Sequence, residues 1–326
     1  MTVDRPARYG IEQMLTDTYH AQREHRDGKL ADYIPELAAV DPDGFGLAIA
    51  TGNGKLFTVG DALTPFTIQS VSKAFAYCLA LELVGREEVL SRVGVEPSGD
   101  PFNAIEFDPH TNRPFNPMVN AGAITVSGML RDAKGDDALA FMLDRFSRAA
   151  GRRLRVNQAV YESEAATGHR NRGISHLLLA VGALNAPVDP VTDLYFQQCA
   201  IEVTAVDLAW MGATLANMGE HPVSGDQVFS MTAVRDTLAV MFSCGMYDYS
   251  GNWAFDIGVP AKSGVGGGIV GVVNRQLGIG SYSPRLDAKG NSVRGVAAFR
   301  QLADEMGLHA FDATNDGSSF VTALTR

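Results

Sequence analysis

The sequence predicts an α+β fold, in which an antiparallel sheet built from both ends of the chain is flanked by helices and interrupted by a helical lobe. Three observations support this prediction. Residues 45–59 have the pattern of a β-hairpin, and residues 269–282 are rich in β-forming residues. Between them, residues 90–217 show mostly helical periodicity separated by polar loops, with no tandem repeat and no low-complexity linker.

The first part of the chain contains a covering helix, a hairpin and a second helix. Residues 11–24 have helical periodicity, and residues 45–50 and 55–59 are apolar strands joined by a Thr-Gly-Asn-Gly turn. Apolar residues then recur at helical spacing over residues 67–84, and Gly85 follows at the position where glycine often ends a helix. Residues 138–150 and 205–218 are the clearest helices of the middle segment.

The last part of the chain returns to β-structure. We expect strands over residues 269–273 and 276–282, a turn at 287–291, a further strand over 293–299 and a final helix over 300–306. The expected organisation is a single domain over residues 1–326. Its α/β lobe covers about 1–70 and 225–326, and its helical lobe covers about 71–224.

The composition excludes several classes of function. The net charge of −10 argues against a nucleic-acid or anionic-membrane surface, and no apolar run approaches the roughly 20 residues of a membrane span. The first ten residues lack the apolar core of a signal peptide. Three cysteines without CxxC spacing are typical of reduced cytosolic thiols, and the scattered histidines predict no metal site. We therefore expect a cytoplasmic protein.

The first motif with catalytic chemistry is Ser70-Val71-Ser72-Lys73, which is an S-x-x-K segment at the predicted start of a helix. Ser70 and Lys73 are just under one helical turn apart and therefore share a face. A serine hydroxyl needs an adjacent base to act as a nucleophile, and a desolvated lysine can lose its proton and serve as that base. Alone, this short pattern is also common among exposed serines and solvated lysines.

The second motif is Lys262-Ser263-Gly264, followed by Val265 and three glycines. In penicillin-recognising enzymes a K-[ST]-G segment lines the sheet edge opposite the nucleophile. Two of only six lysines in the chain fall in these two motifs, in the expected order. The same glycines formally fit G-x-G-x-x-G, but that fingerprint should follow a strand and open a helix, whereas here it precedes a strand.

The chain resembles the bacterial glutaminases, the serine-dependent type related to β-lactamases. The similar blocks run in order along nearly the whole sequence, at residues 69–73, 116–124, 161–164, 170–171, 203–209, 245–248, 260–268 and 286–292. The resemblance implies a β-lactamase/transpeptidase-like fold. It also implies hydrolysis of L-glutamine to L-glutamate and ammonia through a glutamyl-serine intermediate, without a cofactor, by a homo-oligomer that is a dimer or a tetramer.

The resemblance also implies roles for individual residues. Ser70 would be the nucleophile, Lys73 its base, and Tyr247 a proton relay to the leaving ammonia, while Lys262 assists proton transfer. The backbone N–H of Val265 would bind the oxyanion. The expected substrate pocket contains Asn120, Glu164, Asn171 and Tyr195, together with Ser70, Tyr247 and Val265. Glu164 could pair with the α-ammonium group of glutamine through a charge-assisted hydrogen bond.

Other interpretations stay open at this point. A β-lactamase or DD-peptidase would share both motifs, although the chain contains no Ser-Asp-Asn segment. A non-catalytic amino-acid-binding protein is a further alternative, but binding alone does not need a serine–lysine pair. Taken singly, Asn120 is also typical of a turn or helix start, Glu164 of the first turn of a helix, and Tyr195 of a core aromatic residue.

Overall fold

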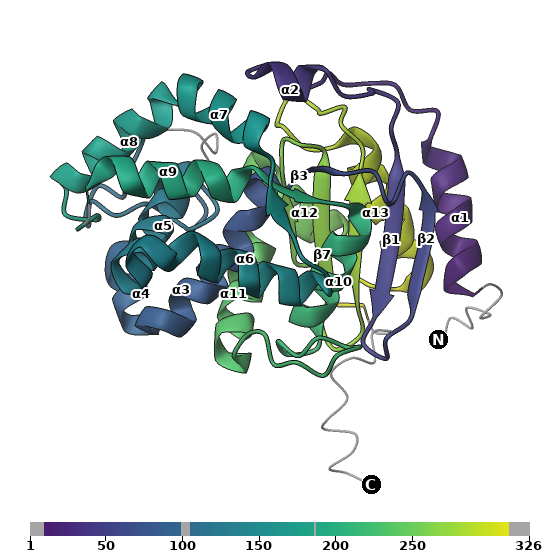
Figure 1. Cartoon of the computed structure of the whole chain (residues 1–326). Coiled ribbons are helices and arrows are strands. Elements are labelled where there is room, and N and C mark those ends of the chain that lie inside the picture. The colour runs from purple at the N-terminus through teal and green to yellow at the C-terminus, as the bar shows by residue number, and fades with distance from the viewer. Residues whose placement is uncertain (1–9, 99–104, 186, 313–326) are drawn as a thin grey trace, which may run out of the picture.

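The computed structural model describes residues 10–98, 105–185 and 187–312. Figure 1 shows a sheet on one side of the molecule and a group of helices on the other. The five strands are antiparallel and follow the order β2-β1-β8-β7-β6, so that the hairpin near the start of the chain pairs with strands near its end. This arrangement confirms the predicted α+β class and the antiparallel sheet flanked by helices.

The strands of the main sheet are β1 (Gly46–Thr51), β2 (Leu56–Gly60), β6 (Ala261–Ser263), β7 (Gly268–Val273) and β8 (Leu277–Tyr282). Alternate side chains of β1 point to opposite faces, with Leu47 and Ile49 in one core cluster and Ala48 and Ala50 in another. The first cluster contains residues of α1 (Ile11–Gln22) and α13 (Val293–Met306). The second contains residues of α10 (Ala205–Ala216), so helices cover both faces of the sheet.

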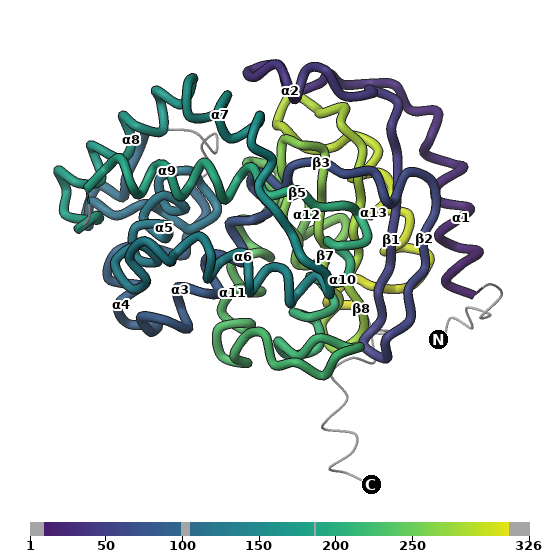
Figure 2. Tube along the Cα trace, in the orientation of Figure 1, coloured from purple at the N-terminus to yellow at the C-terminus, as the bar shows by residue number. Residues whose placement is uncertain are grey.

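The remaining helices are α2 (Pro35–Ala38), α3 (Ser72–Val84), α4 (Arg86–Arg92), α5 (Asn120–Lys134), α6 (Ala138–Ala150), α7 (Gln158–Thr167), α8 (His169–Ala180), α9 (Val188–Cys199), α11 (Met231–Cys244) and α12 (Ser250–Asp256). The trace in Figure 2 shows that most of α3 to α9 lie beside the sheet and not on it. α10 packs against β8, although the predicted division placed it in the helical lobe. The predicted boundaries between the α/β lobe and the helical lobe stay a prediction.

A second, small sheet was not predicted. Its strands β3 (Phe66–Thr67), β5 (Ile201–Val203) and β4 (Arg155–Val156) contain only two or three residues each, which is too short for a recognisable alternation. β3 takes up the start of the helix that we expected over residues 67–84. A short 3₁₀ turn, Gln69–Val71, follows, and the α-helix itself begins at Ser72. The prediction that Gly85 follows the last helical residue is confirmed, and its φ is 85°.

The expected strand over residues 293–299 is wrong, because this segment forms the first half of α13. The hydroxyl of Ser292 accepts a hydrogen bond from the backbone N–H of Gly295 and caps the helix. Ala298, Phe299 and Leu302 then recur at helical spacing and are buried in the core cluster that contains Leu47 and Ile49. The β-branched valines favoured a strand locally, but burial of this helical face decides the structure.

Close contact between α10 and β8 depends on glycine. A Cβ at Gly280 would lie 2.0 Å from the carbonyl oxygen of Ala205, which belongs to the helix backbone and cannot move aside. We expect Gly280→Ala to lower the free energy of unfolding by about 1–3 kcal/mol, as overpacking typically does. Denaturant unfolding followed by circular dichroism measures this. Gly173→Ala is the control, because Gly173 lies on α8 with nothing within 4 Å of an added Cβ. Equal stability of the two variants would contradict the packing argument.

The described residues show neither a membrane-spanning helix nor a cluster of metal ligands. No helix among them combines the length and the apolar character needed to span a bilayer. They also contain no group of three or more His, Cys, Asp or Glu side chains that could hold a metal ion. The predictions for residues 1–9 and 313–326, including the absence of a signal peptide, lie outside the described residues.

Candidate active site

A cavity of about 310 Å³ lies where the start of α3 meets the helices α5, α7, α8 and α9. Six of the predicted site residues line it, namely Ser70, Asn120, Glu164, Asn171, Tyr195 and Val265. Lys73, Tyr247 and Lys262 do not line this cavity but are buried, with exposed fractions of 1%, 8% and 0%. Segments that are far apart in the sequence therefore contribute to one cavity.

Ser70 lies in the 3₁₀ turn that precedes α3, and its side chain is almost buried. Lys73 follows in the first turn of α3. Its ammonium nitrogen donates to Oδ1 of Asn120 at 2.6 Å and to the carbonyl oxygen of Met118 at 3.3 Å. Burial lowers the pKa of Lys73 to about 8, because the charged form loses its hydration. A lysine with this pKa can lose its proton near neutral pH.

α3 differs from the amphipathic helix that we expected, because it is buried on nearly all faces from Ser72 to Leu81. It contacts α4, α5, α6 and α11, which surround it. This position explains why Lys73 is desolvated, which is the main cause of its lowered pKa. The helix buries the Lys73 side chain, and the amide oxygen of Asn120 and a backbone carbonyl accept hydrogen bonds from it.

Tyr247 and Lys262 form a second polar group behind Ser70. The phenol oxygen of Tyr247 shares a hydrogen bond with the Ser70 side chain, and its hydroxyl donates to the carbonyl oxygen of Ser263 at 3.1 Å. Nζ of Lys262 lies 4.3 Å from the centroid of the Tyr247 ring and donates to the carbonyl oxygens of Gly245 and Ser263. Burial, together with the nearby Lys73, holds the pKa of Lys262 well below its usual range. Burial raises the pKa of Tyr247, so its phenol stays protonated and can pass on a proton.

The K-S-G segment occupies the position that the sequence predicted. Lys262 and Ser263 belong to β6, which is an edge strand of the main sheet. Gly264 accepts from the N–H of Gly267 and donates to Gly268, which closes a tight turn between β6 and β7. Val265 lies within this turn and lines the cavity with Ser70. The competing dinucleotide-binding interpretation is wrong, because these glycines lead into strand β7 and open no helix.

Asn120, Asn171 and Tyr195 form one hydrogen-bonded group on the wall of the cavity. Nδ2 of Asn120 donates to Oδ1 of Asn171 at 3.0 Å, and the Tyr195 hydroxyl lies 3.4 Å from Oδ1 of Asn120. Asn120 is the first residue of α5, as the helix-start interpretation allowed, but its side chain also accepts a hydrogen bond from Lys73. Tyr195 belongs to a core cluster, as the core interpretation predicted, and it also lines the cavity. Its contact with a substrate stays a prediction.

Glu164 supplies the negative charge of the cavity. Its carboxylate accepts from the hydroxyl of Tyr33 at 2.9 Å, and a hydrogen bond from Gln69 also reaches it. Burial raises the pKa of Glu164 although these hydrogen bonds oppose the shift. Glu164 lies in the second half of α7, so the alternative of a first-turn carboxylate that complements the helix dipole is wrong. A buried carboxylate with only neutral partners is suited to bind a cationic group of a ligand.

Tyr33 and the side chain of Gln69 were not among the predicted site residues. Tyr33 lies 131 residues before its partner Glu164, in a segment without a motif or regular periodicity, so the sequence carried no signal for it. Gln69 stood inside a family block, and its backbone φ of 48° is unusual for a residue other than glycine. Tyr247 also has a positive φ, of 57°. Such conformations concentrate at functional sites.

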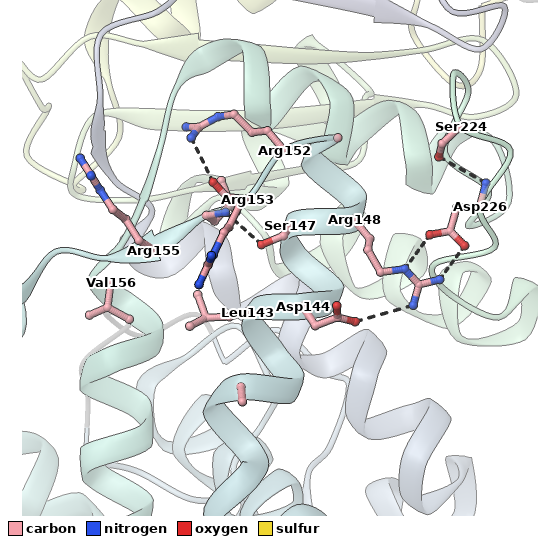
Figure 3. Close-up of a pocket in the computed structure, with 13 residues that line it drawn as sticks. Leu143, Asp144, Ser147, Arg148, Arg152, Arg153, Arg155, Val156, Ser224 and Asp226 are labelled. Atoms are coloured by element: carbon pink, nitrogen blue, oxygen red, sulfur yellow. Dashed lines mark hydrogen bonds and ion pairs between the residues drawn. The ribbon is translucent and has the colours of Figure 1, made fainter.

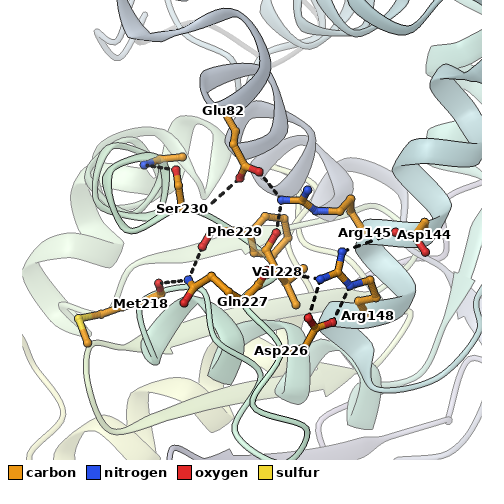
Figure 4. Close-up of polar contacts among 11 residues, drawn as sticks. Glu82, Asp144, Arg145, Arg148, Met218, Asp226, Gln227, Val228, Phe229 and Ser230 are labelled. Atoms are coloured by element: carbon orange, nitrogen blue, oxygen red, sulfur yellow. Dashed lines mark hydrogen bonds and ion pairs between the residues drawn. The ribbon is translucent and has the colours of Figure 1, made fainter.

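A larger cavity of about 830 Å³ lies away from these residues, beside α6 (Figure 3). Four arginines line it, but three of them pair with carboxylates, namely Arg148 with Asp226, Arg152 with Asp207 and Arg155 with Glu202. Nearby, Glu82 of α3 binds both Arg145 and the backbone N–H of Ser230 (Figure 4). These contacts join segments of the fold. Because the arginines of the larger cavity pair with carboxylates, this cavity is a weaker candidate for a ligand site than the smaller one.

The fold and its cavity define the class of protein. Solved structures that resemble the chain include Mglu in its native form, with a TM-score of 0.88 at 41% identity over 94% of this chain and 74% of that chain. A probable glutaminase, ybaS, has a TM-score of 0.90 at 36% identity over 93% of this chain and 98% of that chain. The chain is therefore an α+β protein with the β-lactamase-like fold of these glutaminases, as predicted.

The sequence comparisons identify the family. A glutaminase family profile matches residues 28–311. Glutaminase from Nostoc is 47% identical over 306 residues, which cover 94% of this chain and 92% of that protein. Glutaminase 2 of Bradyrhizobium diazoefficiens is 51% identical over 98% of this chain, and the chain spans 51% of the length of that relative. The chain belongs to the glutaminase family.

Proposed function

We propose that this protein hydrolyses the side-chain amide of L-glutamine to L-glutamate and ammonia. One observation carries the proposal: Ser70, the buried carboxylate of Glu164 and the amides of Asn120 and Asn171 line the same cavity of about 310 Å³. Its volume suits a small zwitterion, and its polar groups suit both ends of that molecule. A relative of 43% identity has been crystallised in its glutamate form, which supports the same product for this chain.

In the proposed reaction Lys73 takes the proton of the Ser70 hydroxyl, and Oγ attacks the amide carbon. The backbone N–H of Val265, in the turn after β6, donates to the oxyanion. Tyr247 passes a proton to the leaving nitrogen, and the side-chain nitrogen of Lys262 beneath its ring supports this transfer. Breaking of the carbon–nitrogen bond releases ammonia and leaves a glutamyl ester on Ser70. Water then hydrolyses this ester to glutamate: one proton of the water restores Tyr247, and Lys73 returns its proton to Oγ of Ser70.

The first experiment is ammonia release by the purified protein from L-glutamine, L-asparagine and D-glutamine in parallel. We expect turnover of L-glutamine alone, because Glu164 on one wall and Ser70 on another set the distance between the ammonium group and the amide. Turnover of a β-lactam without glutamine hydrolysis would support a β-lactamase or DD-peptidase instead. Calorimetric binding of glutamine without ammonia release would support a non-catalytic amino-acid-binding protein.

The pH dependence of the reaction tests the role of Lys73. A base must be unprotonated, so we expect kcat/KM, which reports the free enzyme, to rise with pH and to level off above the Lys73 pKa of about 8. Initial rates of ammonia release between pH 5.5 and 9.5 measure this profile, and circular dichroism at each pH checks that the protein stays folded. A flat profile across this range would show that no group with this pKa limits the reaction.

Substitution of the proposed ammonium ligand should act on binding. We expect Glu164→Gln to raise KM about ten- to a hundred-fold, because a hydrogen bond to a charged group contributes about 1.5–3 kcal/mol. Glu162→Gln is the matched control, since Glu162 is exposed on the same helix, accepts a hydrogen bond from Gln158 and does not line the cavity. Steady-state kinetics with L-glutamine give the KM of each variant. If both variants keep the KM of the unmodified protein, Glu164 does not bind the substrate.

We further propose that the protein is cytoplasmic and forms a homo-oligomer, either a dimer or a tetramer. The three cysteines, Cys78, Cys199 and Cys244, are all free and buried, which fits a reducing compartment. Analytical ultracentrifugation at several concentrations tests the oligomeric state, and a monomer at every concentration would rule it out. The proposal includes no cofactor, no nucleic acid and no membrane partner.

A further inference from the structure

The residue before the proposed nucleophile has an unusual backbone conformation. Gln69 precedes Ser70 and has a φ of 48°, in a region that residues with a side chain rarely adopt. Such a conformation persists only where the surrounding structure holds it in place. The groups that hold the Gln69 carbonyl therefore affect how Ser70 enters the cavity.

A short chain of buried hydrogen bonds reaches this carbonyl. Oγ of Ser72 donates to the carbonyl oxygen of Gln69 at 2.7 Å, and Nε2 of Gln198 donates to Oγ of Ser72 at 2.9 Å. Ser127 Oγ lies 3.3 Å from Oε1 of Gln198. In this arrangement the Gln198 amide occupies an acceptor position of Ser72 and leaves the hydroxyl proton of Ser72 for Gln69.

These hydrogen bonds lie in the interior of the protein and not on its surface. Ser72, Ser127 and Gln198 are all 0% exposed, so solvent does not compete for their hydrogen bonds. They belong to α3, α5 and α9, which also carry Lys73, Asn120 and Tyr195 respectively. None of the three lines the cavity, so a substrate there does not touch them.

We propose that Gln198 is a positioning residue, which acts through Ser72 on the carbonyl of Gln69 and so holds the Ser70 hydroxyl in its attacking direction. The proposal rests on the proposed hydrolysis of glutamine. A polar side chain that served only to stabilise the core would affect unfolding and not the chemistry of Ser70.

The test uses the variants Ser72→Ala, Gln198→Met and their combination, with Gln197→Met as the matched control. Gln197 is the neighbour of Gln198 on α9, and its amide binds Asp193 instead. We expect each of the first two variants to lower kcat about five- to ten-fold with KM changed less than two-fold, which is the effect of one lost hydrogen bond on the transition state. The double variant should lose little more than Ser72→Ala alone, because Gln198 acts through Ser72.

A second measurement does not depend on glutamine. Labelling of Ser70 by a small fluorophosphonate, followed by mass spectrometry, reports the nucleophile directly. We expect it to slow in Ser72→Ala and Gln198→Met and to stay unchanged in Gln197→Met. Unchanged labelling in the first two folded variants, or kcat losses that multiply in the double variant, would overturn the positioning role. Slowed labelling in a protein that releases no ammonia would keep the positioning role and reject the proposed function.

Discussion

Ser70→Ala should abolish ammonia release from L-glutamine, with kcat lowered on the order of 10⁴-fold or more, as loss of the nucleophile does in other serine hydrolases. The variant has no Oγ to attack the amide carbon, and no glutamyl ester can form. The protein should stay folded, because the substitution removes one oxygen atom from a side chain that is already 6% exposed. Ammonia release and thermal unfolding, measured on the same preparation, test both statements.

The controls for Ser70→Ala separate chemistry from binding. Ser91→Ala removes an exposed hydroxyl that donates to the carbonyl of Glu88, and it should keep full activity. Calorimetry should show that Ser70→Ala still binds L-glutamine, since Glu164 and the cavity amides remain. Rapid quenching of the unmodified protein should reveal a glutamyl adduct on the peptide that contains Ser70. Turnover within ten-fold of the unmodified protein would eliminate Ser70 as the nucleophile.

Lys73→Met should produce the second largest loss, with kcat lowered by about 10²–10⁴-fold, which is the usual contribution of a general base. Methionine has a similar length and no charge, so it fills the buried site without requiring the hydration that a charged group would need. The rise of kcat/KM with pH around 8 should disappear with the base. Steady-state kinetics and the pH profile of the variant check both expectations.

The structure also defines the control for this second substitution. Lys55 is exposed in the turn between β1 and β2, so Lys55→Met makes the same chemical change away from the cavity and should be neutral. Asn120 accepts from Lys73, and Lys73→Met leaves its Oδ1 with the Tyr195 hydroxyl as a neighbour. A small increase in KM is therefore compatible with the base role. An unaltered pH profile in Lys73→Met would reject it.

The site and the fold differ in how far the sequence predicted them. Two short motifs, recognised by their residue types and order, predicted Ser70, Lys73 and Lys262 as site residues. Blocks shared with the glutaminase family predicted Asn120, Glu164 and Asn171. Helix α6 was predicted with its observed bounds, Ala138–Ala150, because its apolar residues have a clear helical period. The strand expected at 293–299 failed, since local β-branched residues gave a signal that opposed the burial pattern of α13.

By itself, the sequence determined the α+β class, the order of the two catalytic motifs and the family, because each of these depends on residues that are close together or on the order of the blocks. The tertiary structure alone decided which distant side chains meet. In the folded protein Tyr33 donates a hydrogen bond to Glu164, and helices surround Lys73. Gln198 donates to Ser72, which in turn donates to the carbonyl oxygen of Gln69. The physical reason is that desolvation and hydrogen-bond geometry arise only when separated segments pack, and no local pattern of residues encodes them.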